Sequence, residues 1–344
     1  MKGSPYGIHR VIEPLGTLPQ SAQKIDNSMK IYDNEILIDV DVLNIDAASF
    51  TQIKKMANHD VEKIKEIMLG IVAQRGKHHN PVTGSGGMLV GRVNAIGSDL
   101  KHSIDLQVGD RIATLVSLSL TPLVIKKIKK VHLDRDQVEI DGQAILFETG
   151  IYAKLPADMP DTLALAVLDV AGAPAQTARL VKPGDTVVII GGGGKSGTLC
   201  MYEARKRAGI TGTVIGLGSG EKSCRRIKEL GWADHVLQVD ATDSIAVMEA
   251  VAAVTNDKMA DVTINCVNVP GTEMSSVLAT RDGGIVYYFS MATSFTAAAL
   301  GAEGVGKDVN MMIGNGYAYR HADIALNLLR ESPQLRQLFE KIYV

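Results

Sequence analysis

Hydrophobic and polar positions follow different patterns in the two halves of this 344-residue chain. Over roughly the first 155 residues, short apolar stretches alternate with polar positions between turn residues, most clearly at residues 35–43. Successive side chains of a strand point to opposite faces of a sheet, so this alternation predicts strands with one buried face. The first half is therefore predicted to be rich in β-strands.

A helical pattern interrupts these strands at residues 51–73, where apolar residues recur every three or four positions among lysines and glutamates. That spacing predicts one or two amphipathic helices with a solvated charged face. Residues 75–87 follow as a loop rich in glycine and histidine, and residues 88–95 as a further strand. Because loops of this kind frequently line functional sites, this loop is a candidate.

After residue 156 the pattern changes to compact apolar strands separated by helical segments. Strands that alternate with helices through right-handed crossovers form a doubly wound parallel sheet. The last segments, residues 321–330 and 335–343, also have helical spacing, and we expect them to return to the first domain. The predicted strands are 186–190, 213–217, 236–239, 261–266, 284–289 and 309–313, and the predicted helices lie near 196–209, 221–230, 243–255 and 272–280.

Length and charge narrow the classes of function. A chain of 344 residues fits two domains, which we predict as residues 1–155 with 315–344 and residues 156–314. Lysine and arginine number 36 against 38 aspartates and glutamates. The net charge of −2 lacks the positive excess of a protein that tracks nucleic acid or an anionic membrane, so a small-molecule partner is expected.

The cysteines and the apolar runs indicate the compartment. Three cysteines without paired spacing argue against a disulfide framework and against a cysteine-rich zinc site. The first residues lack the apolar run of a signal peptide, and no stretch of about 18 apolar residues occurs. We therefore expect a cytoplasmic protein that does not enter a membrane.

The most informative motif follows the predicted strand at residues 186–190. Residues 191–197 read Gly-Gly-Gly-Gly-Lys-Ser-Gly, which is a G-x-G-x-x-G pattern. Glycines there permit a tight turn and let backbone N–H groups at the start of the next helix bind a pyrophosphate. The motif predicts dinucleotide binding, with a turn that binds nothing as the alternative. The expected cofactor contacts are Gly192, Gly193, Gly194, Lys195, Ser196 and Gly197.

The end of the second predicted strand bears on the choice between NAD and NADP. A carboxylate at this point would bind the adenosine ribose hydroxyls, but the strand ends Leu-Gly-Ser-Gly without one. Ser219 with Lys222, Arg225 or Arg226 could hold a 2′-phosphate, so we expect NADP to be accepted at least as well as NAD. The alternative is that these cations only decorate the surface of a helix.

Later strand ends point to the same edge of the predicted sheet, where a doubly wound sheet binds its ligand. Cys266 could be a nucleophile, but a lone cysteine at a strand end more often packs than reacts. Ser290 and Thr293 are candidates for polar contacts near the nicotinamide. The cofactor contacts predicted from these strand ends are Cys266, Val267, Asn268, Ser290, Met291 and Asn315.

The order of these elements resembles the medium-chain dehydrogenase/reductase superfamily over the whole chain. The resemblance implies an α/β architecture with a GroES-like β-rich catalytic domain and a Rossmann domain with a doubly wound parallel sheet. Residues 84–97 match the segment that normally reads Gly-His-Glu, but Ser85 replaces the zinc-binding histidine. The cysteine position falls within residues 44–49 and the region of the third ligand begins at Asp169, so neither cysteine nor histidine is present. A zinc ion held as in alcohol dehydrogenases is therefore not expected.

Several unusual segments resemble, more closely, the dehydrogenases that deaminate a 3,5-diamino acid in bacterial lysine fermentation. That resemblance implies oxidation of L-erythro-3,5-diaminohexanoate to 5-amino-3-oxohexanoate and ammonia, with NAD or NADP as hydride acceptor and without a metal. It also implies a homodimer that associates through the edge of the cofactor sheet. The segments that carry the resemblance are residues 9–14, 48–54, 76–87, 170–176 and 297–306.

This activity requires a base, because an amine in water is mostly protonated at neutral pH. Lys77, His78 and His79 form the densest ionisable cluster of the candidate loop. We expect His78 or His79 to act as the base or to activate water, and Lys77 to hold the substrate carboxylate. The alternative is a solvated basic loop.

Three further residues complete the candidate catalytic set. Asp169 could receive the C5 ammonium group or act as the base, or it could cap the following helix instead. Glu148 is a second candidate for binding the ammonium group, and Ser85 occupies the lost zinc-ligand position. The rival functions are a zinc-free quinone or enoyl reductase of the same superfamily, and a protein that binds NAD(P) without turnover.

Overall fold

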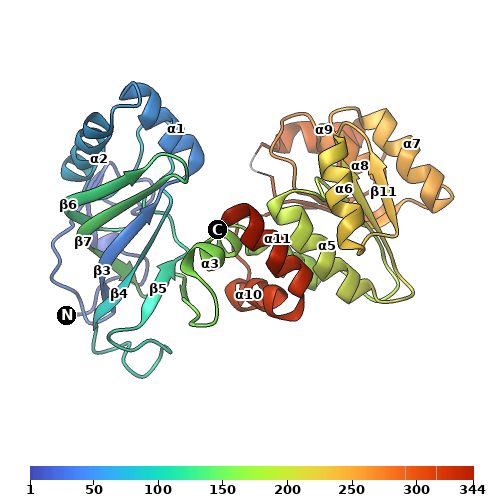
Figure 1. Cartoon of the computed structure of the whole chain (residues 1–344). Helices are drawn as coiled ribbons and strands as arrows, with labels where there is room; N and C mark the ends of the chain where they lie inside the picture. The colour runs from blue at the N-terminus through green and yellow to red at the C-terminus, as the bar shows by residue number, and fades with distance from the viewer. Residues whose placement is uncertain (291, 315) are drawn as a thin grey trace. The chain divides into compact units, whose positions relative to one another are not determined.

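The computed structural model describes residues 1–290, 292–314 and 316–344. Contacts divide the chain into two compact units, Met1–Ala157 and Asp158–Val344, shown in Figure 1. Each unit has its own sheet and its own hydrophobic core, and each is described by itself.

The first unit is built on a six-stranded antiparallel sheet with the strand order β6-β7-β3-β4-β5-β8. Its central strand β3 (Glu35–Asn44) has alternating residues, Ile36, Ile38 and Val40, that are buried in the core. The other elements are β4 (Met88–Ile96), β5 (Arg111–Thr114), β6 (Leu123–His132), β7 (Gln137–Phe147) and β8 (Tyr152–Lys154), with the short 3-10 helix η1 (Ile8–Arg10) and the paired strands β1 (Val11–Glu13) and β2 (Lys24–Ile25).

Two helices occupy the segment predicted to be helical, α1 (Ala47–Met56) and α2 (Val61–Arg75). Asp60 caps the start of helix α2, because its carboxylate accepts hydrogen bonds from two backbone N–H groups of the first turn. Gly76 caps the other end and has a φ of 72°. A Cβ atom there would lie 2.1 Å from the Ile25 carbonyl oxygen, so glycine is required where the candidate loop starts.

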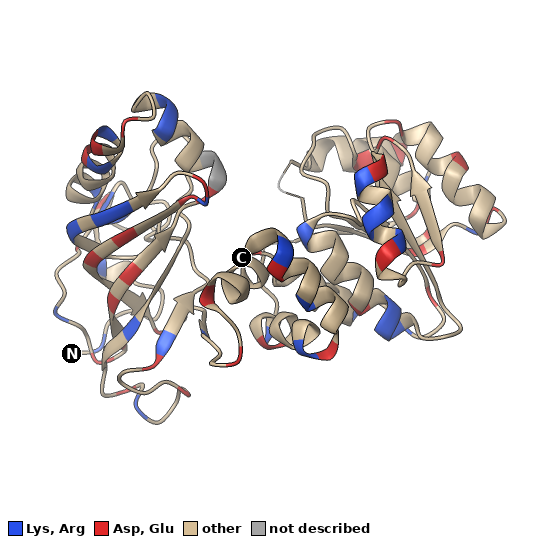
Figure 2. Ribbon diagram, viewed as in Figure 1, with Lys and Arg blue, Asp and Glu red and all other residues tan. Residues whose placement is uncertain are grey.

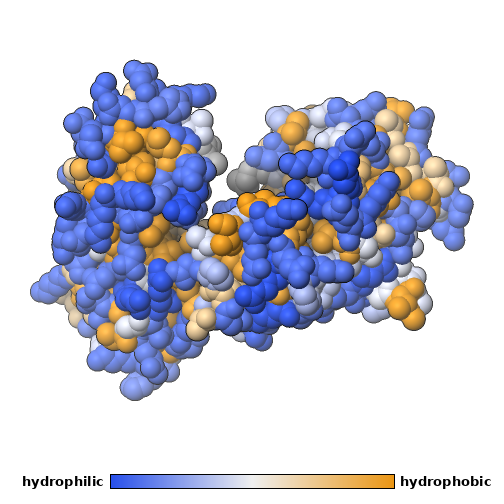
Figure 3. Space-filling model, viewed as in Figure 1, coloured by the Kyte–Doolittle hydropathy of each residue, from blue (hydrophilic) through white to orange (hydrophobic). Residues whose placement is uncertain are grey.

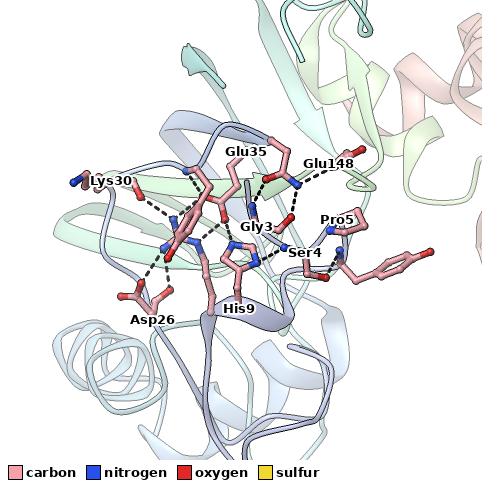
Figure 4. A network of polar contacts seen from close by, with 12 residues as sticks. Gly3, Ser4, Pro5, His9, Asp26, Lys30, Glu35 and Glu148 are labelled. Carbon is pink, nitrogen blue, oxygen red and sulfur yellow. Dashed lines mark hydrogen bonds and ion pairs between the residues drawn. The ribbon is translucent and has the colours of Figure 1, made fainter. Parts of the chain in front are cut away.

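A polar network ties the amino-terminal segment to β3, as Figure 4 shows. Arg10 is buried, and its Nε and Nη2 atoms each donate to the Glu35 carboxylate at 2.6 Å. His9 Nε2 lies 2.9 Å from the same carboxylate, while His9 Nδ1 accepts from the Ser4 N–H. Burial alone would raise the pKa of Glu35, but hydrogen bonds from Arg10 and from the Tyr32 N–H lower the pKa below its usual value.

The second unit is built on a six-stranded parallel sheet with the strand order β11-β10-β9-β12-β13-β14. The order reverses between β9 (Thr186–Ile190) and β12 (Ala260–Asn265), which is where a doubly wound sheet binds its ligand. The fold therefore agrees with the predicted doubly wound class. The other strands are β10 (Thr213–Gly218), β11 (His235–Gln238), β13 (Thr280–Tyr288) and β14 (Asn310–Ile313).

Helices cover both faces of this sheet. Val187 and Ile189 of β9 belong to the core that contains Met201 of α5, whereas Val188 and Ile190 belong to the core that contains residues of α7. This arrangement explains why the strand has a continuous apolar run rather than alternation. The helices are α3 (Asp161–Leu168), α4 (Gly172–Leu180), α5 (Lys195–Ala208), α6 (Glu221–Leu230), α7 (Ser244–Thr255), α8 (Glu273–Ala279), α9 (Phe295–Gly304), α10 (His321–Glu331) and α11 (Pro333–Tyr343).

The carboxy-terminal helices differ from the expected domain division. Helices α10 and α11 pack against α3, α4 and α5 and fall in the second unit, rather than in the β-rich domain. Their buried residues, including Leu328 and Phe339, provide the apolar surface for this packing. Amphipathic spacing predicted the helices correctly, but it carries no information about which core receives them.

The surfaces of both units are chemically mixed. Basic and acidic residues are interspersed along the helices and strands of each unit (Figure 2). On the face shown in Figure 3, patches of apolar side chains lie within a mostly hydrophilic surface. Within the described ranges, none of the helices has the length and the apolar character that a membrane span requires.

Candidate active site

The glycine-rich turn joins β9 to α5 in the predicted place. Gly191 has a φ of 82° directly after β9, and α5 begins at Lys195. A Cβ atom at Gly197 would lie 2.1 Å from the Gly191 carbonyl oxygen, so the helix can approach the turn this closely only with glycine. The first N–H groups of a helix have no partner within it and lie at its positive end, so this turn can bind a pyrophosphate.

A pocket of about 440 Å³ opens at the carboxyl ends of β9, β10, β11 and β12. Four residues predicted as cofactor contacts lie on its wall: Gly194, Ser219, Cys266 and Val267. Lys222, Arg225 and Asn268 are exposed and are not among its lining residues. The remaining lining residues are Ile190, Gly191, Leu217, Gly218, Ser223, Val239, Asp240, Ala241, Thr242 and Val269.

Two polar residues of this pocket, Ser223 and Asp240, were not predicted from the sequence. Asp240 accepts hydrogen bonds at 2.9 Å from both the backbone N–H and the hydroxyl of Thr242, and these bonds lower the pKa of its carboxyl group. The available signal was the sequence Asp-Ala-Thr-Asp directly after the third predicted strand, which is typical of a turn before a helix. The pocket therefore carries one ionised carboxylate.

The cysteine at the wall has a second thiol beside it. Cys266 Sγ lies 3.9 Å from Cys200 Sγ, and both side chains are free thiols. Cys200 is fully buried, and burial raises the pKa of its thiol well above the usual value. Cys266 is half-buried and reaches the pocket, so it both packs and lines the site.

The candidates Ser290 and Thr293 follow the carboxyl end of β13. Ser290 is buried, and its hydroxyl accepts a hydrogen bond from the Ala292 N–H at 3.1 Å. Thr293 Oγ1 is buried and has no hydrogen-bond partner among the described residues. An unpaired buried hydroxyl is costly, so Thr293 is suited to bind a polar ligand group. Two further predicted contacts, Met291 and Asn315, lie outside the described residues.

Asp169 lies against the glycine-rich turn. It follows the last residue of α3, and its Oδ2 atom accepts from Lys195 Nζ at 2.8 Å. Lys195 Nζ also lies 5.2 Å from the centre of the Tyr343 ring. The alternative role of Asp169 as an amino-terminal cap is not observed, because α4 begins later and Ala171 precedes it.

The predicted cluster of Lys77, His78 and His79 lies in the first unit, and its side chains differ in burial. Lys77 is fully buried, and its Nζ atom donates to the carbonyl oxygens of Pro19 at 2.6 Å and Gln20 at 3.3 Å. Burial, together with the charge of Arg75, lowers the pKa of Lys77 to about 8. The ammonium group is thus committed to the backbone of another loop and is not placed to hold a substrate carboxylate.

The two histidines of this cluster differ in their burial. His78 is fully buried, neither ring nitrogen has a hydrogen-bond partner among the described residues, and burial lowers its pKa to about 4. His79 is half-buried, with its ring beside Gly84. Burial lowers the pKa of His79, and the charges of Lys77 and Arg75 lower it further. Of the two, only His79 combines partial exposure with a neutral ring at pH 7.

Three hydroxyl groups gather beside this loop. Ser49 Oγ lies 2.5 Å from Thr83 Oγ1 and 2.6 Å from Ser85 Oγ, and Ser49 is fully buried. The buried Asn80 fixes the turn, because its Oδ1 atom accepts from the Val82 and Thr83 N–H groups. The structure therefore places Ser85 in a hydroxyl cluster that the sequence analysis did not predict.

These residues do not fit a zinc ion of the alcohol-dehydrogenase type. Zinc sites use thiolate, imidazole or carboxylate ligands, whereas Ser49, Thr83 and Ser85 offer neutral hydroxyls that bond to one another. The Asp46 carboxylate accepts from the Gly86 N–H at 3.1 Å. Among the residues that the structure describes, no group of three or more His, Cys, Asp or Glu side chains could hold a metal ion.

Glu148 belongs to a different part of the first unit. It follows β7, is exposed, and accepts from Asn34 Nδ2 at 2.8 Å in the network at the amino terminus (Figure 4). Asn34 also binds the backbone of Gly3 on both its polar atoms. The structure thus gives Glu148 a partner in the anchoring of the amino-terminal segment.

The sequence is similar to two known protein families and to two full-length relatives. Residues 9–156 match the family described as "L-erythro-3,5-diaminohexanoate dehydrogenase N-terminal domain", and residues 197–305 match "Zinc-binding dehydrogenase". An L-erythro-3,5-diaminohexanoate dehydrogenase of Acetoanaerobium sticklandii is 62% identical over 344 residues, covering 100% of both chains. One of Fusobacterium nucleatum subsp. nucleatum is 59% identical over 343 residues, covering 100% of this chain and 99% of its own.

Solved structures share the fold at much lower identity. A mycobacterial quinone oxidoreductase matches with a TM-score of 0.55 and 17% identity, covering 91% of this chain and 86% of its own. The alcohol dehydrogenase TADH from Thermus sp. ATN1 matches with a TM-score of 0.54 and 18% identity, covering 92% and 87%. A mycobacterial structure complexed with NADPH has a TM-score of 0.52 and 15% identity, covering 95% and 87%. These matches support the two-domain α/β architecture.

Proposed function

The chain belongs to the L-erythro-3,5-diaminohexanoate dehydrogenase family, and from this premise we propose that it oxidises the C3 amine of L-erythro-3,5-diaminohexanoate with NAD⁺ or NADP⁺, giving 5-amino-3-oxohexanoate and ammonia. It is an oxidoreductase. The observation that carries the proposed substrate is 62% identity over the full length of a relative with that name. The alternative of a quinone or enoyl reductase is not favoured, because those solved neighbours share only the fold.

The nicotinamide cofactor, when bound, supplies the hydride acceptor. The N–H groups at the start of α5 would hold its pyrophosphate, and Ser219, Cys266 and Val267 line the pocket that would receive it. Thr293 supplies a buried hydroxyl after β13 that has no partner among the described residues. Both NAD⁺ and NADP⁺ remain acceptors in this proposal, because Ser219, directly after β10, and the Asp240 carboxylate both lie on the pocket wall.

His79 is the proposed base. The amine at C3 must lose a proton before its lone pair can expel a hydride, and a neutral imidazole with a lowered pKa can accept that proton at pH 7. Oxidation leaves a protonated carbon–nitrogen double bond, to which water adds. One proton of this water moves to the nitrogen, the other passes to solvent as the carbonyl forms, and the protonated His79 returns its proton to the ammonia, which leaves as ammonium. The residue is therefore unchanged after one turnover.

The neighbours of His79 have supporting roles in this proposal. Lys77 fixes the start of the loop through the Pro19 and Gln20 carbonyls, and the side chain of His78 is buried in the first unit. The hydroxyls of Ser85 and Thr83 are the polar groups offered to the substrate. Asp169 is the proposed receiver of the C5 ammonium group, because it is a half-exposed carboxylate beside the glycine-rich turn.

The edge strand β14 supports a homodimer. Met312 and Ile313 on this strand are 36% and 57% exposed, and Phe295 on α9 is 69% exposed. An unpaired parallel-sheet edge with exposed apolar side chains favours pairing with a second copy of the chain. A reducing, cytoplasmic setting is also part of the proposal, because Cys200 and Cys266 lie close together as free thiols.

The test is a set of initial rates with L-erythro-3,5-diaminohexanoate, with NAD⁺ and NADP⁺ in parallel and with and without a chelator. We expect one ammonia to be released for each reduced nicotinamide that forms. The chelator should not lower the rate. Failure of the diamino acid to reduce either dinucleotide would contradict the proposed substrate. Inhibition by the chelator would contradict the metal-free chemistry while leaving the substrate assignment intact.

A further inference from the structure

We infer that Lys195 is a positioning residue that couples the two ligands, because its ammonium group masks the Asp169 carboxylate until a dinucleotide pyrophosphate takes it over. This inference rests on the proposed function, in which Asp169 receives the C5 ammonium group of the substrate. It concerns how each ligand affects the affinity for the other, and it is carried by contacts within the second unit.

The first observation is where Lys195 stands. It is the first residue of α5, directly after Gly194 on the wall of the nucleotide pocket. A pyrophosphate bound at this helix start carries two negative charges close to the Lys195 side chain. In the structure, that side chain pairs with the Asp169 carboxylate, with Lys195 Nζ 2.8 Å from Asp169 Oδ2.

The second observation is that the pair is open to exchange. The side chains of Lys195 and Asp169 are 28% and 44% exposed, so water reaches both. Ion pairs of this exposure contribute less than about 1 kcal/mol, which corresponds to about fivefold in an equilibrium constant. A bound pyrophosphate can therefore take Lys195 from Asp169 at small cost, which a buried pair would not allow.

The third observation is a support that keeps the ammonium group near the turn. The Tyr343 ring lies 5.2 Å from Lys195 Nζ, and a cation over an aromatic face is attracted to it. Arg226 Nη1 donates to the Gly193 carbonyl at 2.5 Å, so a second cation is fixed at the same turn. The turn thus has one cation bound to the backbone and one paired with a carboxylate.

The consequence is cooperative binding of the two ligands. Without a cofactor, the Asp169 carboxylate is neutralised and attracts the C5 ammonium group weakly. With a cofactor, Lys195 bonds the pyrophosphate, and the Asp169 carboxylate is free for the substrate. The two ligands then strengthen each other's binding by the same factor, as linkage requires.

The experiment measures dissociation constants by calorimetry. The diamino acid is titrated into the ligand-free enzyme and into the enzyme saturated with the reduced dinucleotide, which has the same pyrophosphate and permits no turnover of the amine. For the native enzyme we expect tighter binding of the diamino acid, about two- to fivefold, when the dinucleotide is present.

The variants separate the two partners of the ion pair. Asp169→Asn should bind the reduced dinucleotide about two- to fivefold more tightly than the native enzyme and the diamino acid more weakly. Lys195→Met should bind the dinucleotide more weakly, and its affinity for the diamino acid should no longer depend on the dinucleotide. Lys206→Met is the matched control, because Lys206 lies on the same helix, pairs with Glu331 and stands 5.6 Å from the Tyr202 ring. It should change neither constant.

A double variant distinguishes two explanations for tighter dinucleotide binding by Asp169→Asn. One is the release of Lys195 from the ion pair, and the other is the loss of direct repulsion between Asp169 and the pyrophosphate. In the Lys195→Met background, Asp169→Asn should no longer tighten dinucleotide binding. Tightening that persists there, or a native dissociation constant in Asp169→Asn, would overturn the inference. Both measurements are dissociation constants for the dinucleotide alone, so their outcome does not depend on the turnover assay that tests the proposed substrate.

Discussion

Lys77, His78 and His79 are adjacent in the chain but have three different environments. The lysine is buried with carbonyl partners, His78 is buried without a partner, and His79 is half-buried. Their residue types identify a candidate loop, but the carbonyl groups that bind the buried Lys77 come from residues 19–20, far away in the sequence. Composition therefore predicted the candidate loop and could not predict which side chain is available.

His79→Asn should lower kcat by about 100-fold or more, because asparagine cannot accept the substrate proton. Dinucleotide binding should be unchanged, since that pocket lies in the second unit. In the native enzyme kcat/KM should fall on the acid side with an inflection below about pH 6.5, because the pKa of His79 is lowered. The measurement is a pH profile of initial rates. His102→Asn, an exposed histidine in a turn, is the control, and an equal loss there would refute the assignment.

The pKa of Lys77 predicts a specific dependence of stability on pH. Its folded value is about 8 against 10.5 for an ordinary lysine, so between these values the unfolded chain binds more protons than the folded one. The native protein should therefore gain stability relative to Lys77→Met as the pH rises from about 8 towards 10, by up to about 3 kcal/mol. Urea unfolding of both proteins over this range measures the difference, and a difference that stays constant with pH would contradict the lowered pKa.

At the scale of elements, the strands and the glycine-rich turn were the most predictable features. The sequence of β9 and its glycines determines the local conformation, so the strand and the turn after it could be located before any tertiary contact was known. The pocket residue Asp240 was missed because it follows a strand two positions away in the sheet, which only the strand order brings to the same edge. Helix α9 was missed because its alanine-rich sequence lacks a clear apolar period.

Two glycines of the turn should respond differently to the same change. Gly197→Ala should destabilise the protein by about 1–3 kcal/mol, because its Cβ atom would overlap the Gly191 carbonyl oxygen. At Gly194 the same atom would be 3.3 Å away, so Gly194→Ala should unfold like the native protein but bind the dinucleotide at least about tenfold more weakly, since the methyl group enters the pocket. Thermal unfolding and dinucleotide titration test the pair. Equal unfolding temperatures for the two variants would show that the close approach at Gly197 is not required.

At the scale of the whole molecule, the proposed dimer uses the edge of the parallel sheet. Ile313→Lys should convert the proposed dimer to a monomer, because a lysine on an exposed edge strand opposes pairing with another copy. Ile210→Lys is the control, since Ile210 is fully exposed in a turn away from the edge. Sedimentation velocity of the three proteins at equal concentration measures the masses. A native monomer, or a dimer that survives Ile313→Lys, would exclude association through β14.

The strand order of the parallel sheet also affects how the chain is made on the ribosome. All strand pairings of the first unit lie between residues 11 and 154, so that unit can close while the rest is still being synthesised. Strand β9 ends at Ile190, but its neighbour β12 begins only at Ala260. A nascent chain that stalls between these points exposes one edge of its most apolar strand, and such stalled chains are the ones that chaperones must shield from aggregation.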